Sequence, residues 1–269
     1  MVLWNKKWIL FSIIGFLLNA FPVASLYFTS DFPAETKNKE NTQIISVLLS
    51  NVFSSNNRYN LLLNQIETNK PDFIIVLELS PAWANALKPI EEYYPHNIVI
   101  PRNDNFGIAL YSKQPLHDIE IHDFAQNSIP TISANYQINK STNKNLQIIA
   151  THPLPPINAS LAEQQVVHLQ KLASYINKQD KSQVLLAGDF NSTPWSPHYK
   201  NLIQQTNLSN TRQGFGIYPS WPTGLKSSLL QIPLDHIFVS KGIHTKAFKT
   251  LQSINSDHLP VYVKLELVK

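Results

Sequence analysis

Acidic, amide and imidazole side chains recur in this sequence at the ends of short apolar runs, either just after a run or just before one. Eight polar residues share this placement: Asn51, Glu78, His152, Asp189, Asn191, Asp235, Asp257 and His258. Each alone has an ordinary structural explanation, such as a turn, a helix cap or a salt bridge. Carboxylates gathered in one place, however, repel one another unless a cation or a proton lies among them. A hard divalent cation held by oxygen ligands meets that need, so the group predicts a metal-dependent site.

The absence of cysteine narrows the choice of metal. With no cysteine in 269 residues, disulfides, thiolate-bound zinc, iron–sulfur clusters and thiol nucleophiles are excluded. The remaining ligands are oxygen and imidazole nitrogen, which favour Mg²⁺, Mn²⁺ or Ca²⁺.

The net charge of +4 is weak evidence for a polyanionic partner. Two of the 22 Lys and Arg residues, Lys6 and Lys7, lie in an N-terminal segment without acidic residues, which leaves 20 against 18 Asp and Glu. A surplus of that size does not indicate a nucleic-acid-binding surface.

The elements that must position the polar residues alternate between strand-like and helix-like patterns. Fully apolar or alternating runs predict strands over 44–52, 72–77, 107–111, 131–138, 146–151, 184–187, 234–239 and 259–267. Helical periodicity predicts helices over 58–68, 81–87 and 161–176. Strands in succession, mixed with helices, indicate an α/β or α+β fold in one domain over 43–269. Strand ends are where such a scaffold presents side chains rigidly to solvent.

The N-terminus reads as a targeting or anchoring segment. Lys6 and Lys7 precede an apolar stretch from Trp8 to Phe28 whose 21 residues would rise about 31 Å as a helix, enough to span a bilayer core. Val23-Ala24-Ser25 is a weak signal-peptidase site, so residues 1–30 are a signal-anchor or a signal peptide. The apolar run continues past that site, which favours the anchor. The lysines predict that the rest of the chain is exported: periplasmic and held at the bacterial inner membrane, or secreted if cleaved. Polar residues 31–42 are the predicted linker.

The motifs around these residues carry a family resemblance. In order, they are Asn51, VLELSP with Glu78, Thr151-His152, GDFNS over 188–192, LDHIFVS over 234–240 and SDHLPV over 256–261. The set covers nearly all of residues 44–267 and resembles the endonuclease/exonuclease/phosphatase (DNase I-like) superfamily, specifically a bacterial branch with N-terminal membrane segments. The resemblance implies a four-layer α/β sandwich, two packed mixed β-sheets flanked by helices, and an enzyme that hydrolyses phosphoric esters with Mg²⁺ or Mn²⁺.

The resemblance also assigns roles to the acidic residues and to the amides. It implies that Glu78 is the principal metal ligand, assisted by Asn51 and Asp257. Asp189 is expected to orient or deprotonate the attacking water, and Asn191 to hold that water or a phosphate oxygen.

The resemblance gives the two histidines catalytic roles. It implies that His258 donates to the phosphoryl oxygen, with Asp235 fixing its tautomer and orientation, and that His152 contacts the phosphate or assists the leaving group. Many family members have Gln before the metal-binding Glu, where this chain has Leu77. That Gln does not touch the metal, so the roles stand.

Three functions compete on this sequence. The first is a nuclease or related phosphodiesterase acting on nucleic acid, supported by the complete hydrolytic set. The second is a phospholipid or phosphoinositide phosphoesterase, supported by the membrane segment and the near-neutral remainder. A non-catalytic binding module is third, and it would require a damaged site, whereas every expected position is filled. We expect a monomer held at a membrane by its N-terminal helix.

Overall fold

The computed structural model describes residues 6–28, 42–126, 128–139, 144–179, 183–224 and 230–268. The predicted linker 31–42 lies outside the described residues except for Thr42, which begins the first strand.

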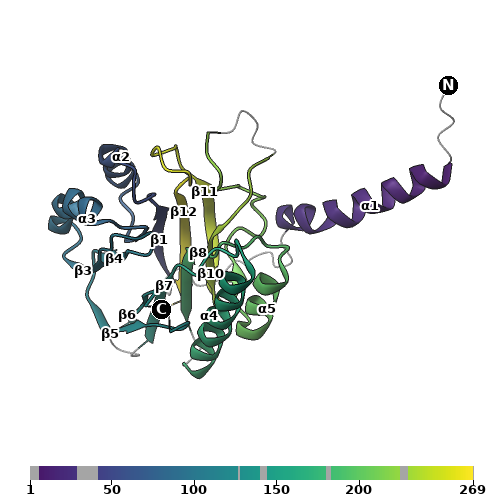
Figure 1. Ribbon diagram of the computed structural model, residues 1–269. Helices are drawn as coiled ribbons and strands as arrows, with labels where there is room; N and C mark the ends of the chain where they lie inside the picture. Colours follow the sequence, from purple (N-terminus) through teal and green to yellow (C-terminus); the bar gives the residue numbers. More distant parts are fainter. Residues whose placement is uncertain are drawn as a thin grey trace.

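Within the described residues, two six-stranded mixed sheets form the centre of the molecule (Figure 1). The first sheet has the strand order β11 (His244–Thr250), β12 (Val261–Val268), β1 (Thr42–Asn51), β2 (Phe73–Leu77), β4 (Ile108–Ser112) and β3 (His96–Ile100). The second has the order β5 (Leu116–His122), β6 (Thr131–Asn139), β7 (Lys144–Thr151), β8 (Val184–Asp189), β10 (Asp235–Val239) and β9 (Ser209–Asn210).

Helices cover the outer face of each sheet. The first sheet carries α2 (Tyr59–Asn69) and α3 (Pro81–Leu87), and the second carries α4 (Ala159–Lys178) and α5 (Pro197–Thr206) (Figure 1). Packing on both faces of β2 explains why its sequence is apolar throughout. Phe73, Ile75 and Leu77 face the core between the sheets, while Ile74 and Val76 face the helices. A strand covered on both faces has no solvent side to make polar. The predicted four-layer sandwich is confirmed.

The predicted strands and helices that carry the polar motifs are all present. Sequence patterns missed elements that are polar or lie at sheet edges, namely β3, β5, α5, β9 and β11. Strand β5 (LHDIEIH) exposes Asp118 to Ile121, and β11 (HTKAFKT) is interrupted by a register shift between Thr245 and Ala247. An edge strand buries less of its surface, so its apolar periodicity is weak.

The N-terminal helix stands apart from the sandwich. Helix α1 (Lys6–Ala24) continues into a 3₁₀ turn (Ser25–Tyr27) and projects away from the sheets (Figure 1). The span Trp8–Tyr27, 20 residues with a mean hydropathy of 2.1, is the one helix among the described residues that is long and apolar enough to cross a membrane. Most of its described side chains are exposed, so it is not a core helix of the sandwich. A membrane anchor and a signal sequence both fit this finding.

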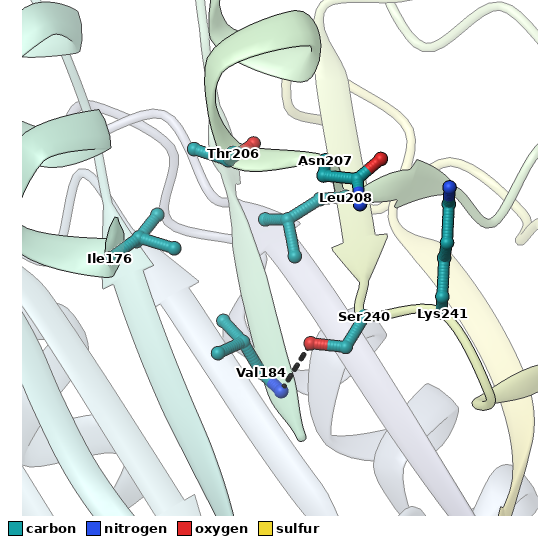
Figure 2. A pocket seen from close by; sticks show the side chains of 7 residues that line it. All are labelled: Ile176, Val184, Thr206, Asn207, Leu208, Ser240 and Lys241. Carbon is teal, nitrogen blue, oxygen red and sulfur yellow. Dashed lines mark hydrogen bonds between the residues drawn. The ribbon is translucent and has the colours of Figure 1, made fainter. Parts of the chain in front are cut away.

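A small pocket lies at the end of the second sheet remote from the polar motifs. Its volume is about 120 Å³, and Val184, the first residue of β8, lines it together with Ser240 and Lys241 (Figure 2). Ser240 Oγ accepts a hydrogen bond from Val184 N at 2.8 Å. Because Asp189 ends the same strand, this pocket is separate from the candidate site.

Gly188 is required by the close approach of two strands. A Cβ at this position would lie 2.0 Å from the Thr151 carbonyl oxygen on neighbouring β7, with no flexible side chain to move aside. We predict that Gly188→Ala lowers the free energy of unfolding by about 2 kcal/mol or more through overpacking. Urea denaturation measures this, with Gly242→Ala as the comparator because Gly242 has open space and only a positive φ. Equal losses in both variants would contradict the overpacking explanation.

Candidate active site

Strand register brings the predicted residues to one end of each sheet. In the first sheet β1 and β2 are parallel with Asn51 opposite Leu77, so Asn51 and Glu78 leave the sheet together. In the second, β7 and β8 are parallel with Thr151 opposite Gly188. His152 and Asp189 therefore emerge side by side, since the carboxyl ends of neighbouring parallel strands share an edge.

The two half-sites join across the gap between the sheets. Asp235 begins β10 directly opposite Asp189 in the antiparallel pair. His258 lies on the loop before β12 of the other sheet, and its Nδ1 is 2.7 Å from Asp235 Oδ2. Asn51 makes a second link between the sheets, because its Nδ2 donates to Asp189 Oδ2 at 3.2 Å.

Asp189 lies at the centre of this arrangement. Its Oδ2 lies 3.5 Å from His258 Nε2 and 3.7 Å from His152 Nε2, while Oδ1 accepts from the Asn191 backbone N at 2.9 Å. The residue is only 1% exposed. A carboxylate buried to that degree is stable only where donors and cations surround it, and here two imidazoles and an amide do so.

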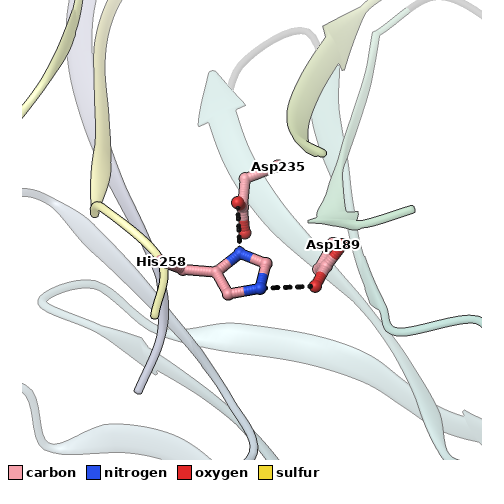
Figure 3. A group of neighbouring side chains, drawn as sticks. All are labelled: Asp189, Asp235 and His258. Atoms are coloured by element: carbon pink, nitrogen blue, oxygen red, sulfur yellow. Dashed lines mark hydrogen bonds and ion pairs between the residues drawn. The ribbon is translucent and has the colours of Figure 1, made fainter. Parts of the chain in front are cut away.

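His258 is held between two carboxylates (Figure 3). Burial alone would lower the pKa of His258, but the charges of Asp235 and Asp189 outweigh burial and raise the pKa to about 10. At neutral pH the ring is therefore an imidazolium with both nitrogens protonated. Its Nδ1–H is committed to Asp235, which leaves Nε2–H on the Asp189 side as the proton available to a substrate.

Glu78 occupies an uncommon backbone conformation at the end of β2. Its φ is 57°, the left-handed region that non-glycine residues seldom adopt and that recurs at functional sites. Asn51 Nδ2 donates to Glu78 Oε1 at 3.0 Å and Ser54 N donates to Oε2 at 3.3 Å. Burial raises the pKa of the Glu78 carboxyl, and the neighbouring His152 and Asn51 oppose that rise.

Two predicted residues lie less centrally than the others. Asp257 is half-buried, and its Oδ2 accepts from Trp221 Nε1 at 3.2 Å. Asn191 is also half-buried with a φ of 47°, and its Nδ2 donates to the Pro153 carbonyl at 3.0 Å. In this arrangement Asn191 fixes the loop after His152, so its contact with a phosphate or a water stays a prediction.

A family model of the endonuclease/exonuclease/phosphatase family matches residues 48–258, which include seven of the eight site residues within the span and His258 at its end. The chain belongs to the endonuclease/exonuclease/phosphatase family. Members of this family are hydrolases of phosphoester bonds, so the chain is a phosphoric ester hydrolase. The family and the enzyme class expected from the motifs are both confirmed.

Known proteins resemble this chain at low sequence identity. A Vibrio campbellii protein described as a UPF0294 protein is 30% identical over 138 residues, which are 50% of this chain and 44% of that protein, so the match spans less than half of the relative. An endonuclease/exonuclease/phosphatase from Bacteroides vulgatus superposes with a TM-score of 0.70 at 17% identity, covering 84% of this chain and 99% of that one.

Two further structures of the same fold have stated ligands or activities. D. rerio TDP2 complexed with single-strand DNA product has a TM-score of 0.69 at 16% identity, covering 83% of this chain and 99% of that one. The mannosyl-6-phosphatase Bt3783 of Bacteroides thetaiotaomicron has a TM-score of 0.64 at 19% identity, covering 82% and 99%.

Three further residues hold the loops of the site together, and the sequence patterns predicted these contacts for none of them. Gln165 is 1% exposed, and its Nε2 donates to the Leu154 and Phe190 carbonyls at 3.0 and 3.1 Å, joining the loops after β7 and β8. Ser256 Oγ donates to the Asn51 carbonyl at 2.8 Å, and Trp221 donates to Asp257 as described. Gln165 had a readable signal, because it occupies the buried stripe of an amphipathic helix where an apolar residue is normal.

Buried histidines beside the site should make the fold acid-sensitive. Burial lowers the pKa of His168 to about 4, and its Nε2 lies 2.8 Å from Thr151 Oγ1 on the strand that leads to His152. The folded protein keeps this ring neutral, whereas the unfolded chain binds a proton below about pH 6.5. Stability is therefore lost as pH falls from about 6.5 towards 4.

We predict that His168→Gln removes about 2 kcal/mol of the loss in unfolding free energy between pH 6.5 and 4.5. Urea titrations of both proteins at a series of pH values measure the difference in slope. His117→Gln, at a half-exposed position on β5, serves as the control. Parallel pH profiles for wild type and His168→Gln would contradict the prediction.

Proposed function

We propose that this chain hydrolyses phosphodiester bonds by attack of water, and that its substrate is nucleic acid. The single observation that carries the chemistry is the Asp189 carboxylate, buried and directed at His258 Nε2, His152 Nε2 and Asn51 Nδ2 within 3.7 Å. This arrangement places a base and a protonated acid side by side, which is what displacement at an anionic phosphorus centre requires.

The proposed roles follow from the protonation states. Asp189 accepts the proton of the attacking water, which raises the nucleophilicity of that water. His258 presents Nε2–H to a phosphoryl oxygen and neutralises the charge that develops there, while Asp235 holds the ring and its cation in place. His152, buried with its Nε2 towards Asp189, assists the leaving group.

A divalent cation fits the remaining donors. Glu78, Asn51 and Asp257 supply oxygen ligands of the kind that Mg²⁺ and Mn²⁺ bind, and the raised pKa of Glu78 marks a carboxylate whose burial a cation would offset. Asp189, Asp235 and His258 lie within 4.8 Å of one another and form an alternative cation site among the described residues. We assign the cation to Glu78 instead, because an imidazolium with both ring nitrogens protonated offers no lone pair to a cation. When bound, the cation polarises the phosphoryl group as a Lewis acid.

Removal of divalent metal tests the proposal. We expect the full chain in detergent to cleave single-stranded DNA, plasmid DNA or RNA with Mg²⁺ or Mn²⁺, and to lose activity at least about 100-fold in EDTA, in keeping with a cation worth several kcal/mol. Returning the metal should restore the rate. Intact nucleic acid under every metal condition, alongside cleavage of bis-p-nitrophenyl phosphate, would reject the substrate and keep the chemistry.

Nucleic acid is favoured because a protein of the same fold, D. rerio TDP2, was solved with a single-strand DNA product. Phospholipid is the second candidate, and the apolar helix α1 favours it because that helix would hold the enzyme at a bilayer. Release of a phosphorylated headgroup from sphingomyelin or phosphoinositide vesicles, with no cleavage of nucleic acid, would decide for lipid.

We further propose that residues 1–30 anchor the protein, that 31–42 link the anchor to a catalytic domain over 43–269, and that this domain acts as a monomer on the non-cytoplasmic side. Lys6 and Lys7 before the apolar span support that orientation. Protease protection in spheroplasts distinguishes the orientations, and the mass of the processed chain reveals cleavage.

A further inference from the structure

The guanidinium of Arg212 is buried next to Asp235, and no carboxylate of the described residues forms an ion pair with it. The residue is 0% exposed, and its guanidinium carbon Cζ lies over the ring of Phe248, 4.7 Å from the ring centre. Its hydrogen bonds go to main-chain carbonyls: Nη1 donates to Ile217 and Tyr218 at 3.2 Å, and Nη2 donates to Asp235 at 2.7 Å. Removing a cation so completely from water costs free energy, so we expect the contacts of Arg212 to have a structural or functional role.

The bond to Asp235 is the one that reaches the active site. Asp235 O is fixed by Arg212, while the side chain of the same residue holds His258 Nδ1 at 2.7 Å. The Asp235 backbone N donates to Ser220 Oγ at 3.2 Å. Both the backbone N–H and the carbonyl of Asp235 are therefore hydrogen-bonded to the 210–220 segment. A shift of Arg212 would therefore move the carboxylate that orients the imidazolium.

The turn that carries Arg212 is itself held by the end of the N-terminal helix. Gly214 N and Gly216 N donate to the Leu26 carbonyl at 2.9 and 3.1 Å, and Leu26 is buried. Gln213 Nε2 donates to the carbonyls of Ser25 and Phe28. We call residues 25–28 the clasp.

Glycine is required where the clasp meets the turn. Gly216 has a φ of +114°, and a Cβ there would lie 2.7 Å from the ring of Tyr27. The contact thus combines main-chain hydrogen bonds, a buried leucine and a close aromatic approach. Such a contact is specific, in contrast to an apolar helix that merely leaves the domain.

We propose that Arg212 is a positioning residue for the Asp235–His258 pair and that the clasp, by fixing the 213–216 turn, holds Arg212 in place. This rests on the proposed function, in which His258 acts on the phosphoryl group. The segment next to the apolar helix thereby contributes to the geometry of a site to which it supplies no side chain.

Steady-state hydrolysis of bis-p-nitrophenyl phosphate by the full chain in detergent, with saturating Mg²⁺, tests the proposal. We expect Arg212→Met to lower kcat about 10- to 100-fold, the scale of a misplaced catalytic group, with KM within about twofold. Arg212→Lys, which reaches fewer carbonyls, should fall in between. Gln213→Ala, which loosens the clasp, should lower kcat about 3- to 10-fold by the same displacement. Arg58→Met and Gln205→Ala, at exposed positions, are the matched controls.

Two readouts separate positioning from simple folding. Activity is compared at a temperature where circular dichroism shows each variant fully folded, and NMR follows the His258 Nδ1–H proton shared with Asp235, which should shift in Arg212→Met and not in Arg58→Met. An unchanged kcat and proton resonance in folded Arg212 variants, with His258→Gln inactive, would overturn this inference alone. Full activity in His258→Gln would overturn the proposed function itself. Should Arg212→Met not fold, Arg212→Lys and Gln213→Ala carry the same comparison.

Discussion

Replacing Asp189 by Asn is expected to lower kcat about 10³- to 10⁴-fold while the protein stays folded. Asparagine keeps the size of the side chain and can accept from the Asn191 backbone N as Asp189 Oδ1 does at 2.9 Å. It cannot accept the proton of water, and loss of a general base costs up to about 10⁴-fold. It also removes one of the charges that hold the pKa of His258 at about 10. Single-turnover hydrolysis at saturating metal measures the effect, with the substrate that the metal-dependence test identifies.

Asn191→Ala is the matched comparison, because it alters the same motif without touching the base. It removes the hydrogen bond from Asn191 Nδ2 to the Pro153 carbonyl at 3.0 Å, which should loosen the loop after His152. We expect a smaller loss in kcat, about 10- to 100-fold, because His152 would be displaced when the loop after it loses this support. A loss in Asp189→Asn no greater than in Asn191→Ala would show that the carboxylate is not the base.

Local patterns along the chain predicted strands and helices mixed in one domain, and the family resemblance of the motifs predicted the four-layer sandwich. Strand β2 is apolar throughout and is followed at once by Glu78. Strand β8 has no polar side chain before Asp189, its last residue, and Asn191 follows two positions later. The ends of buried strands can therefore be predicted from the change from apolar to polar residues. The edge strands β5 and β11 were not predicted, because polar residues share their exposed faces.

Which residues touch one another was beyond sequence pattern, because it depends on register between strands far apart in the chain. Nothing local indicates that Asp235 lies opposite Asp189. That Asp235 orients His258, whose Nδ1 lies 2.7 Å from Asp235 Oδ2 of the other sheet, was predicted by the family resemblance and not by any pattern near either residue. The supporting residues were still harder to find. Arg212 is one of three arginines in the sequence, and its hydrogen bonds go to main-chain carbonyls, which no pattern of side chains reveals.

His258→Gln is expected to lower kcat about 10²- to 10³-fold, the cost of removing a donor to a developing oxyanion, because glutamine carries no cation to the phosphoryl group. Asp235→Asn should cause a loss of similar size, since the amide no longer stabilises the imidazolium at 2.7 Å and favours the wrong ring tautomer.

The double variant decides whether the two residues act as one unit. Independent residues would multiply their losses to about 10⁴- to 10⁶-fold, whereas a pair joined through one hydrogen bond should lose little more than the worse single variant. Asp257→Asn, which is joined to Trp221 at 3.2 Å and not to Asp235, supplies the contrasting cycle with His258. Losses that multiply in the Asp235–His258 cycle would mean that Asp235 stabilises the fold of β10 and that Asp189 alone stabilises the imidazolium. Losses that do not multiply would mean that Asp235, on the second sheet, stabilises the charge that His258, on the first sheet, presents to the substrate. The site would then depend on the packing of the two sheets against each other.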